Sequence, residues 1–97
     1  MPKGIIKIKD KYFEWSTISD APTTYSMSLE ELHEYIKEEY GNVGLKDLPE
    51  RLERVEKWGS SFITENLNDT IRFNRAGDNE DNISKNKIYE KYAQPVI

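Results

Sequence analysis

The chain has 97 residues, of which 36% are hydrophobic, and a formal net charge of −4 from 18 acidic and 14 basic residues. This length predicts a single domain over residues 1–97 with one compact core. The acidic balance argues against direct DNA binding, because the phosphate backbone attracts cations. The absence of cysteine excludes disulfides, thiolate catalysis and cysteine-ligated metal sites.

Targeting and cofactor signals are also missing from the sequence. No apolar run approaches the roughly 20 residues of a membrane span, and the first residues lack the long apolar stretch of a signal peptide. There is no glycine-rich phosphate loop and no Walker lysine. We therefore expect a cytoplasmic protein without a cofactor or a membrane partner.

Residues 4–9 and 12–19 have the alternating pattern of two strands joined at positions 10 and 11. The isoleucines of the first segment alternate with lysines, and Phe13 and Trp15 of the second alternate with polar residues. A period of two places the apolar set on one face of a sheet. The pattern predicts a β-hairpin whose apolar side chains share one face.

The clearest local signal is the start of a helix at Ser28. Ser28 and Glu31 have the spacing of a capping box, and Gly41 is a natural left-handed helix end. We expect a helix over residues 29–40. Its buried stripe at helical spacing comprises Leu29, Leu32, Ile36 and Tyr40.

A second helix is expected over residues 48–58, after a turn over residues 41–44. Asp47 and Glu50 have the spacing of another capping box, and Gly59 follows the helix. The expected buried stripe comprises Leu48, Leu52 and Val55. The pair does not suit a DNA-reading helix-turn-helix, because glutamates on the second helix repel phosphates.

The last third of the chain is less regular. Residues 60–64 are interpreted as a short strand and residues 69–75 as a longer one, with a helix through Leu67 as the competing interpretation. A polar loop over residues 77–82 precedes a last helix over residues 84–93. The expected fold class is α+β: a small, mainly antiparallel sheet that starts with the hairpin and packs against two or three short helices.

Two groups of residues are candidates for binding a ligand or partner. In the first, Trp15 and Tyr25 bracket a loop that contains Thr23 and Thr24. Aromatic rings with nearby hydroxyls stack on, and hydrogen-bond to, a base or a peptide. The alternative is that Trp15 belongs to the core and that the threonines only lead into the first helix.

The second group contains Arg72, Asn74 and Arg75 on the expected strand, with Arg54 and Arg51 of the second helix converging on them. Arginines hold phosphates and carboxylates by forked contacts. Ordinary surface ion pairs with the excess glutamates are the alternative explanation.

Catalytic and metal-binding patterns are weak. Asp78, Glu80 and Asn82 alternate like the start of a calcium loop, but the glycine at its sixth position and the glutamate at its twelfth are missing. His33 is the single histidine and has no evident nucleophile beside it. We predict no catalytic and no metal-ligating residue, with a small hydrolase using His33 as the remaining alternative.

Three strings carry a resemblance that spreads over most of the chain. They are Trp15-Ser16-Thr17 followed by Asp20-Ala21-Pro22, Leu48-Pro49-Glu50-Arg51-Leu52-Glu53-Arg54-Val55-Glu56, and Asn74-Arg75-Ala76-Gly77. With them the chain resembles small proteins encoded by tailed bacteriophages. The resemblance implies an accessory protein in the cytoplasm of an infected bacterium, where it binds host factors such as defence proteins or their nucleotide signals. It implies no activity, cofactor or site residue.

The expected function is therefore that of a non-enzymatic binding protein. It would inhibit or adapt a host protein, through contacts made by the acidic surface of the first helix and adjacent loops. The alternative is a protein that sequesters a small anionic, cyclic nucleotide. Since the chain is short, such sites are expected between the subunits of a homo-oligomer.

Overall fold

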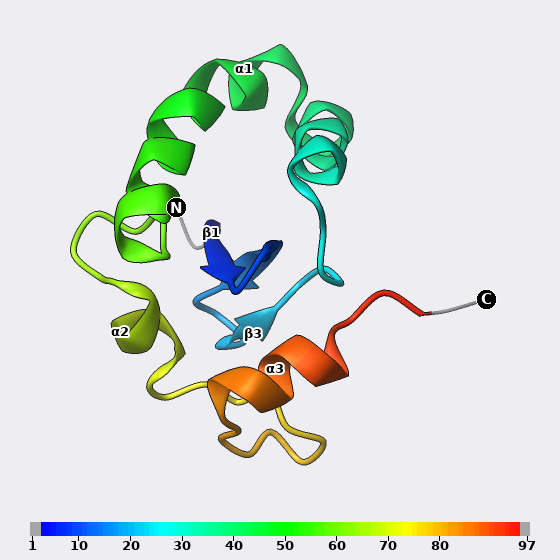
Figure 1. The fold of residues 1–97 in the computed structure, drawn as a ribbon, viewed down its shortest axis with the longest axis vertical. Coiled ribbons are helices and arrows are strands. Elements are labelled where there is room, and N and C mark those ends of the chain that lie inside the picture. The colour runs from blue at the N-terminus through cyan, green and yellow to red at the C-terminus, as the bar shows by residue number, and fades with distance from the viewer. Residues whose placement is uncertain (1–2, 96–97) are drawn as a thin grey trace.

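A three-stranded antiparallel sheet lies at the centre of the computed structural model, which describes residues 3–95 (Figure 1). Helices surround the sheet, so the expected α+β class is confirmed. The elements in chain order are β1 (Lys3–Ile8), β2 (Lys11–Ser16), β3 (Ala21–Pro22), α1 (Leu29–Trp58), α2 (Leu67–Ile71) and α3 (Lys85–Lys91).

The predicted N-terminal hairpin is confirmed, with its turn one residue earlier than expected. Ile8 pairs with Lys11, so the turn consists of Lys9 and Asp10, and Lys9 has a positive φ of 56°. The segment expected to be a loop after the hairpin adds the short edge strand β3, in which Pro22 pairs with Trp15. Proline has no backbone N–H to donate, and at the edge of a sheet no further strand requires that donor.

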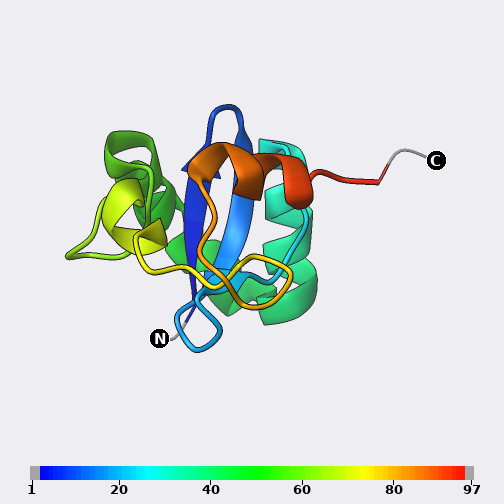
Figure 2. The same ribbon diagram turned by 90° about the horizontal axis from the view of Figure 1, so that it is seen from below.

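Both faces of the sheet are covered (Figure 2). One face packs against α1. The opposite face carries Phe13 and Trp15, which pack with residues of α2, α3 and the loops beside them. Glu14 lies on the opposite face from Phe13 and Trp15, as alternation predicts, and it is 1% exposed on the α1 side.

The helix α1 consists of two segments that meet at Gly41 and arch over the sheet (Figure 1). Its start is as predicted: the Ser28 hydroxyl accepts from the Glu31 N–H at 3.2 Å, and the Glu31 carboxylate accepts from the Ser28 N–H at 2.8 Å. Gly41 breaks the helix with φ 65° and ψ −155°. Its end is also as predicted, at Gly59 with φ 80°.

The predicted turn over residues 41–44 and the second capping box are wrong. The chain resumes the helix directly after Gly41, so Asp47 lies inside α1 rather than at a helix start. Pro49 is also internal and leaves the Leu45 carbonyl without its usual donor. The complete burial of the neighbouring Leu48 against the sheet stabilises this arrangement.

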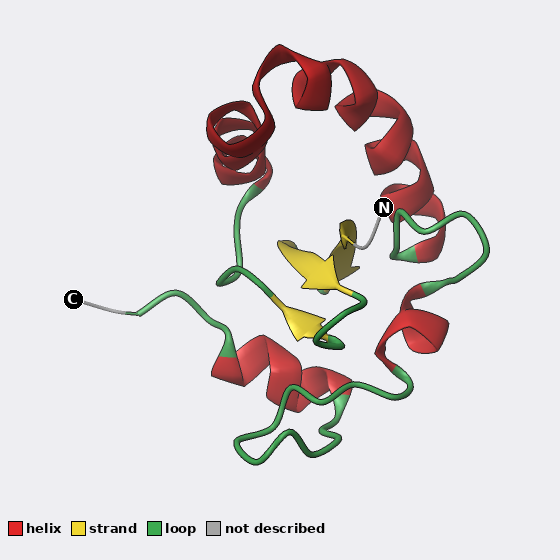
Figure 3. Ribbon diagram, turned by 180° about the vertical axis from the view of Figure 1, so that it is seen from behind, coloured by secondary structure: helices red, strands yellow, loops and turns green. Residues whose placement is uncertain are grey.

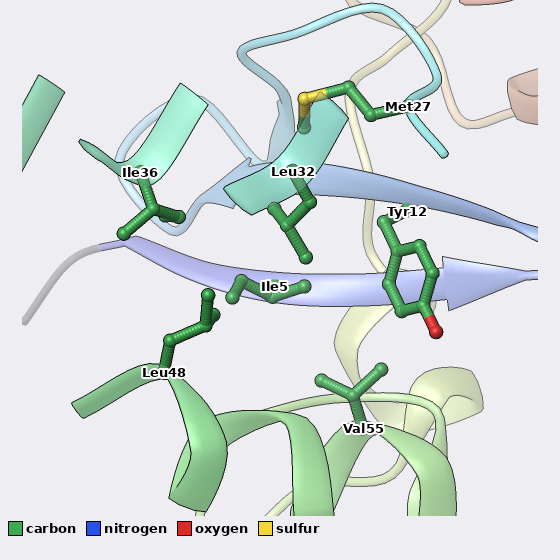
Figure 4. Close-up of a cluster of buried hydrophobic side chains, with 7 residues drawn as sticks. All are labelled: Ile5, Tyr12, Met27, Leu32, Ile36, Leu48 and Val55. Carbon is green, nitrogen blue, oxygen red and sulfur yellow. The ribbon is translucent and has the colours of Figure 1, made fainter. Parts of the chain in front are cut away.

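The core between α1 and the sheet contains most of the two predicted helix stripes (Figure 4). Leu52 packs at its edge, whereas Leu29 is 45% exposed because it lies at the beginning of α1. The buried cluster comprises Ile5, Tyr12, Met27, Leu32, Ile36, Leu48 and Val55.

The chain after α1 differs most from the prediction. Residues 60–64 form no strand and contribute only a bridge between Ser60 and Ile6. The strand predicted over residues 69–75 is wrong, because the competing helix forms as α2. Asn66 and Asp69 cap it reciprocally, and capping favours a helix over an extended segment.

The C-terminal elements are close to prediction. Ser84 caps α3, and the polar loop over residues 77–82 is irregular and exposed (Figure 3). Between residues 3 and 95, no helix has both the length and the apolar character to cross a membrane.

Candidate functional site

A buried carboxylate lies between the sheet and the first segment of α1. One Glu14 oxygen accepts hydrogen bonds from the hydroxyls of Thr23 and Tyr35, each at 2.7 Å. The other accepts from the Tyr40 hydroxyl at 2.5 Å. The Lys3 ammonium lies 3.9 Å from the first oxygen. We call Glu14, Thr23, Tyr35 and Tyr40 the Glu14 cluster.

The Glu14 cluster holds the carboxylate in its charged form. Burial by itself raises the pKa of Glu14, but the hydroxyl donors and the Lys3 charge outweigh it, and the net pKa is lower than usual. Burial and the carboxylate together raise the pKa of Tyr40 to about 12. The hydrogen bonds to both oxygens tie β2 and the segment with Thr23 to α1.

The stability of the protein is expected to fall in acid through Glu14. A carboxyl whose pKa is lower when folded contributes stability above its unfolded pKa of about 4.3, and this is lost as the pH falls through the folded value. The melting temperature should therefore drop between pH 5 and pH 3 by more in the native protein than in Glu14→Gln. Equal drops in both proteins would show that other carboxyls dominate.

An open groove lies beside this cluster, between the second segment of α1, the start of β1 and the segment that follows α1. Its volume is about 400 Å³. We call it the Arg51 groove; it is lined by Lys3, Asp47, Glu50, Arg51, Arg54, Ser61, Phe62 and Ile63.

The three cations of the groove differ in how they are held. Arg54 donates from Nε to the Ser61 carbonyl at 2.7 Å and forms an ion pair with Glu50 at 3.4 Å. Lys3 has only its long contact with Glu14. Arg51 is half-buried, yet it makes no hydrogen bond or ion pair with another residue of 3–95. Burial lowers the pKa of Arg51, and the charge of Glu14 opposes this effect.

Apolar side chains also line the groove. The Phe62 ring covers Gly4, where the first side-chain carbon of any other residue would come within 2.6 Å of the ring. Ile63 is 81% exposed, and it also lines a neighbouring hollow together with Trp58, which is 48% exposed. The groove thus combines an unpaired guanidinium with an exposed apolar rim.

The first predicted binding group is not assembled as a site. Trp15 is 1% exposed and belongs to the core, so it has no free face for stacking. Thr23 bonds to the Glu14 carboxylate, and the Thr24 hydroxyl accepts from the Glu14 N–H at 3.1 Å. Tyr25 remains 54% exposed. The alternative interpretation of Trp15 as a core residue is the one that the structure supports.

The second predicted group is only partly correct. Arg54 lines the groove with Arg51, but the other members lie elsewhere. Asn74 is buried and bonds to the Ile71 and Ile83 carbonyls. Arg75 pairs with Asp20 and Glu80, which supports the alternative of surface ion pairs. Arg72 is exposed, 5.4 Å from the centroid of the Phe73 ring.

The residues of the weak catalytic and metal-binding patterns either make other contacts or are exposed. Asp78 pairs with Lys91 at 2.9 Å, and Asn82 donates to the carbonyls of Arg72 and Asn74. His33 is exposed on α1, in a shallow hollow that it shares with leucine and glutamate side chains. Within residues 3–95, no three acidic or histidine side chains are grouped to hold a metal ion.

Comparisons of the chain with protein families, with characterised proteins and with solved structures find no match. A function is therefore inferred from the contacts of the described residues alone. The sequence did not predict that Lys3, Phe62 and Ile63 line the groove. No local pattern marks them, because they meet Arg51 only when β1 and the segment after α1 pack against the helix.

Proposed function

We propose that this protein is a non-enzymatic binding protein that acts by contact between proteins, through the Arg51 groove and its apolar rim. The observation that carries the proposal is Ile63, which is 81% exposed between the groove and the hollow lined by Trp58. Exposed large apolar side chains beside a concave surface are a common feature of protein interfaces.

The resemblance to small phage proteins suggests where such a partner would be. In this proposal the protein is an accessory protein in the cytoplasm of an infected bacterium, and it inhibits or adapts a host protein. The acidic face of the first α1 segment would then steer the complex by its charge. The groove would supply the close contact.

Three of the residues that were expected to form a nucleotide site do not come together at the groove. Trp15 is in the core, and Arg72 and Arg75 do not line the groove. No contact among the described residues favours a base over a peptide. Nucleotide binding is therefore kept only as an outcome of the tests below.

Replacing Ile63 by glutamate should weaken partner binding by about tenfold or more, because it places a charge at an apolar contact. The measurement is retention of bacterial proteins on the immobilised protein over a range of salt concentrations, with identification by mass spectrometry. A matched control is Ile18→Glu, since Ile18 is also exposed, at 74%, and does not line the groove. Both substitutions should leave stability almost unchanged.

The proposal requires a partner that the native protein and Ile18→Glu retain and that Ile63→Glu loses. Equal retention by both variants, or no specific retention, would overturn it. Light scattering provides a second check. A homo-oligomer that dissociates in Ile63→Glu would show that the groove receives another copy of the chain, which would also overturn the proposal of a different partner.

A further inference from the structure

The Arg51 guanidinium makes no hydrogen bond or ion pair with any described residue. Arginine carries five N–H donors in a planar fork, and a partly buried cation is stabilised further when an anion pairs with it. We propose that Arg51, with Lys3 and Arg54 beside it, binds a carboxylate on an acidic segment of the partner protein. This inference rests on the proposed function, in which the groove receives a partner.

The surrounding contacts favour Arg51 as the anchor of such a site. The bond from Arg54 to the Ser61 carbonyl fixes one wall of the groove. Lys3 adds a second positive charge that is only loosely engaged, at 3.9 Å from Glu14. The charge of Glu14 acts on Arg51, but no hydrogen bond or ion pair joins the two side chains. An incoming carboxylate would supply that pair.

The charge of the groove selects a carboxylate over a phosphate. Its three cations are offset by two carboxylates, Asp47 and Glu50, which leaves a formal charge of +1 among the lining residues. A carboxylate carries one negative charge, whereas a phosphate monoester carries about −1.5 to −2. The charge of a phosphate exceeds the +1 of the lining, and Asp47 and Glu50 would repel it more strongly than they repel a carboxylate.

The apolar residues of the groove indicate which side chain accompanies the carboxylate in the partner's segment. Phe62 and Ile63 line the same hollow as Arg51. A volume of about 400 Å³ is at the lower end of the range of ligand pockets and accommodates a few side chains. The chemistry recognised is therefore an acidic residue next to a large apolar one.

The test uses nuclear magnetic resonance of the arginine Nε–H groups in the full chain. The probes are an acetylated five-residue peptide amide with alternating glutamate and leucine, its glutamine counterpart, and inorganic phosphate at matched ionic strength. The glutamate peptide should shift the Arg51 Nε–H signal and bind about tenfold more tightly than the glutamine peptide, because charged hydrogen bonds exceed neutral ones by this order.

Variants distinguish a specific contact by Arg51 from a general effect of positive charge. Arg51→Gln should remove the preference for the glutamate peptide, and Arg51→Lys should restore only part of it, because lysine lacks the fork. The matched control is Arg72→Gln, since Arg72 is exposed and does not line the groove. This control should bind both peptides as the native protein does.

Two results would overturn the inference: a larger Arg51 shift with phosphate than with the glutamate peptide, or no shift with any probe. Either result leaves the proposed function intact if partner retention still depends on Ile63. Conversely, an Arg51 shift with the glutamate peptide supports a carboxylate site even if no bacterial protein is retained. The failures of the two proposals are thus distinguishable.

Discussion

Replacing Glu14 by alanine should lower the free energy of unfolding by about 3–5 kcal/mol, as removal of one partner from a buried charged network does. The substitution removes a carboxylate that is 1% exposed and leaves the hydroxyls of Thr23, Tyr35 and Tyr40 without their acceptor. It also removes the nearest negative charge from Lys3. Urea unfolding followed by circular dichroism measures the change.

Two further variants show whether the hydrogen bonds cause this loss. Glu14→Gln keeps the shape and one strong acceptor, so its cost should lie clearly below that of alanine. Tyr40→Phe removes a single donor and should cost about 1–3 kcal/mol. If the free energy of unfolding of Glu14→Ala were within about 1 kcal/mol of the native value, the Glu14 cluster would not be a structural tie between β2 and α1.

Local chemistry explains why the helix ends were predictable. The capping box at Ser28 and the left-handed cap at Gly59 act within a few residues, and the structure has both where the sequence indicates them. Gly41 also breaks the helix at the expected position, with a positive φ but not as a left-handed cap. The N-terminal hairpin also follows from local alternation. These features depend on residues that are close in the sequence and not on long-range contacts.

Long-range packing explains what was missed. Alternation separates Glu14 from Phe13 and Trp15, but it does not say that α1 covers the face that Glu14 occupies. The helical course of the chain after Gly41 depends on burying Leu48 against Ile5, which outweighs the turn chemistry around Pro49.

The candidate site shows the same limit. Arg51 and Arg54 were predicted to converge with Arg72, Asn74 and Arg75 around an anion. Their expected companions were assigned to a strand that does not exist, since Asn66 and Asp69 cap a helix there. The actual companions come from β1 and from residues 61–63.

Replacing Gly44 by alanine should destabilise the protein by about 1–3 kcal/mol, although alanine normally stabilises a helix by about 1 kcal/mol relative to glycine. An added Cβ at Gly44 would lie 2.5 Å from the Cβ of Tyr40 and 3.0 Å from a methyl of Ile36. Neither atom is at the flexible end of a side chain, so the two α1 segments would have to separate. Thermal or urea unfolding measures the change.

The control for helix propensity is Asn42→Ala, since Asn42 is exposed in the same segment and should be neutral or slightly stabilised. Gly41→Ala has open space around it but a φ of 65°, so any loss there reports backbone strain alone. A stabilised Gly44→Ala would show that the segments do not pack closely. Because the packing at Gly44 sets how the segment bearing Arg51 approaches the sheet, Gly44→Ala should also weaken binding of the glutamate peptide, while Asn42→Ala should not.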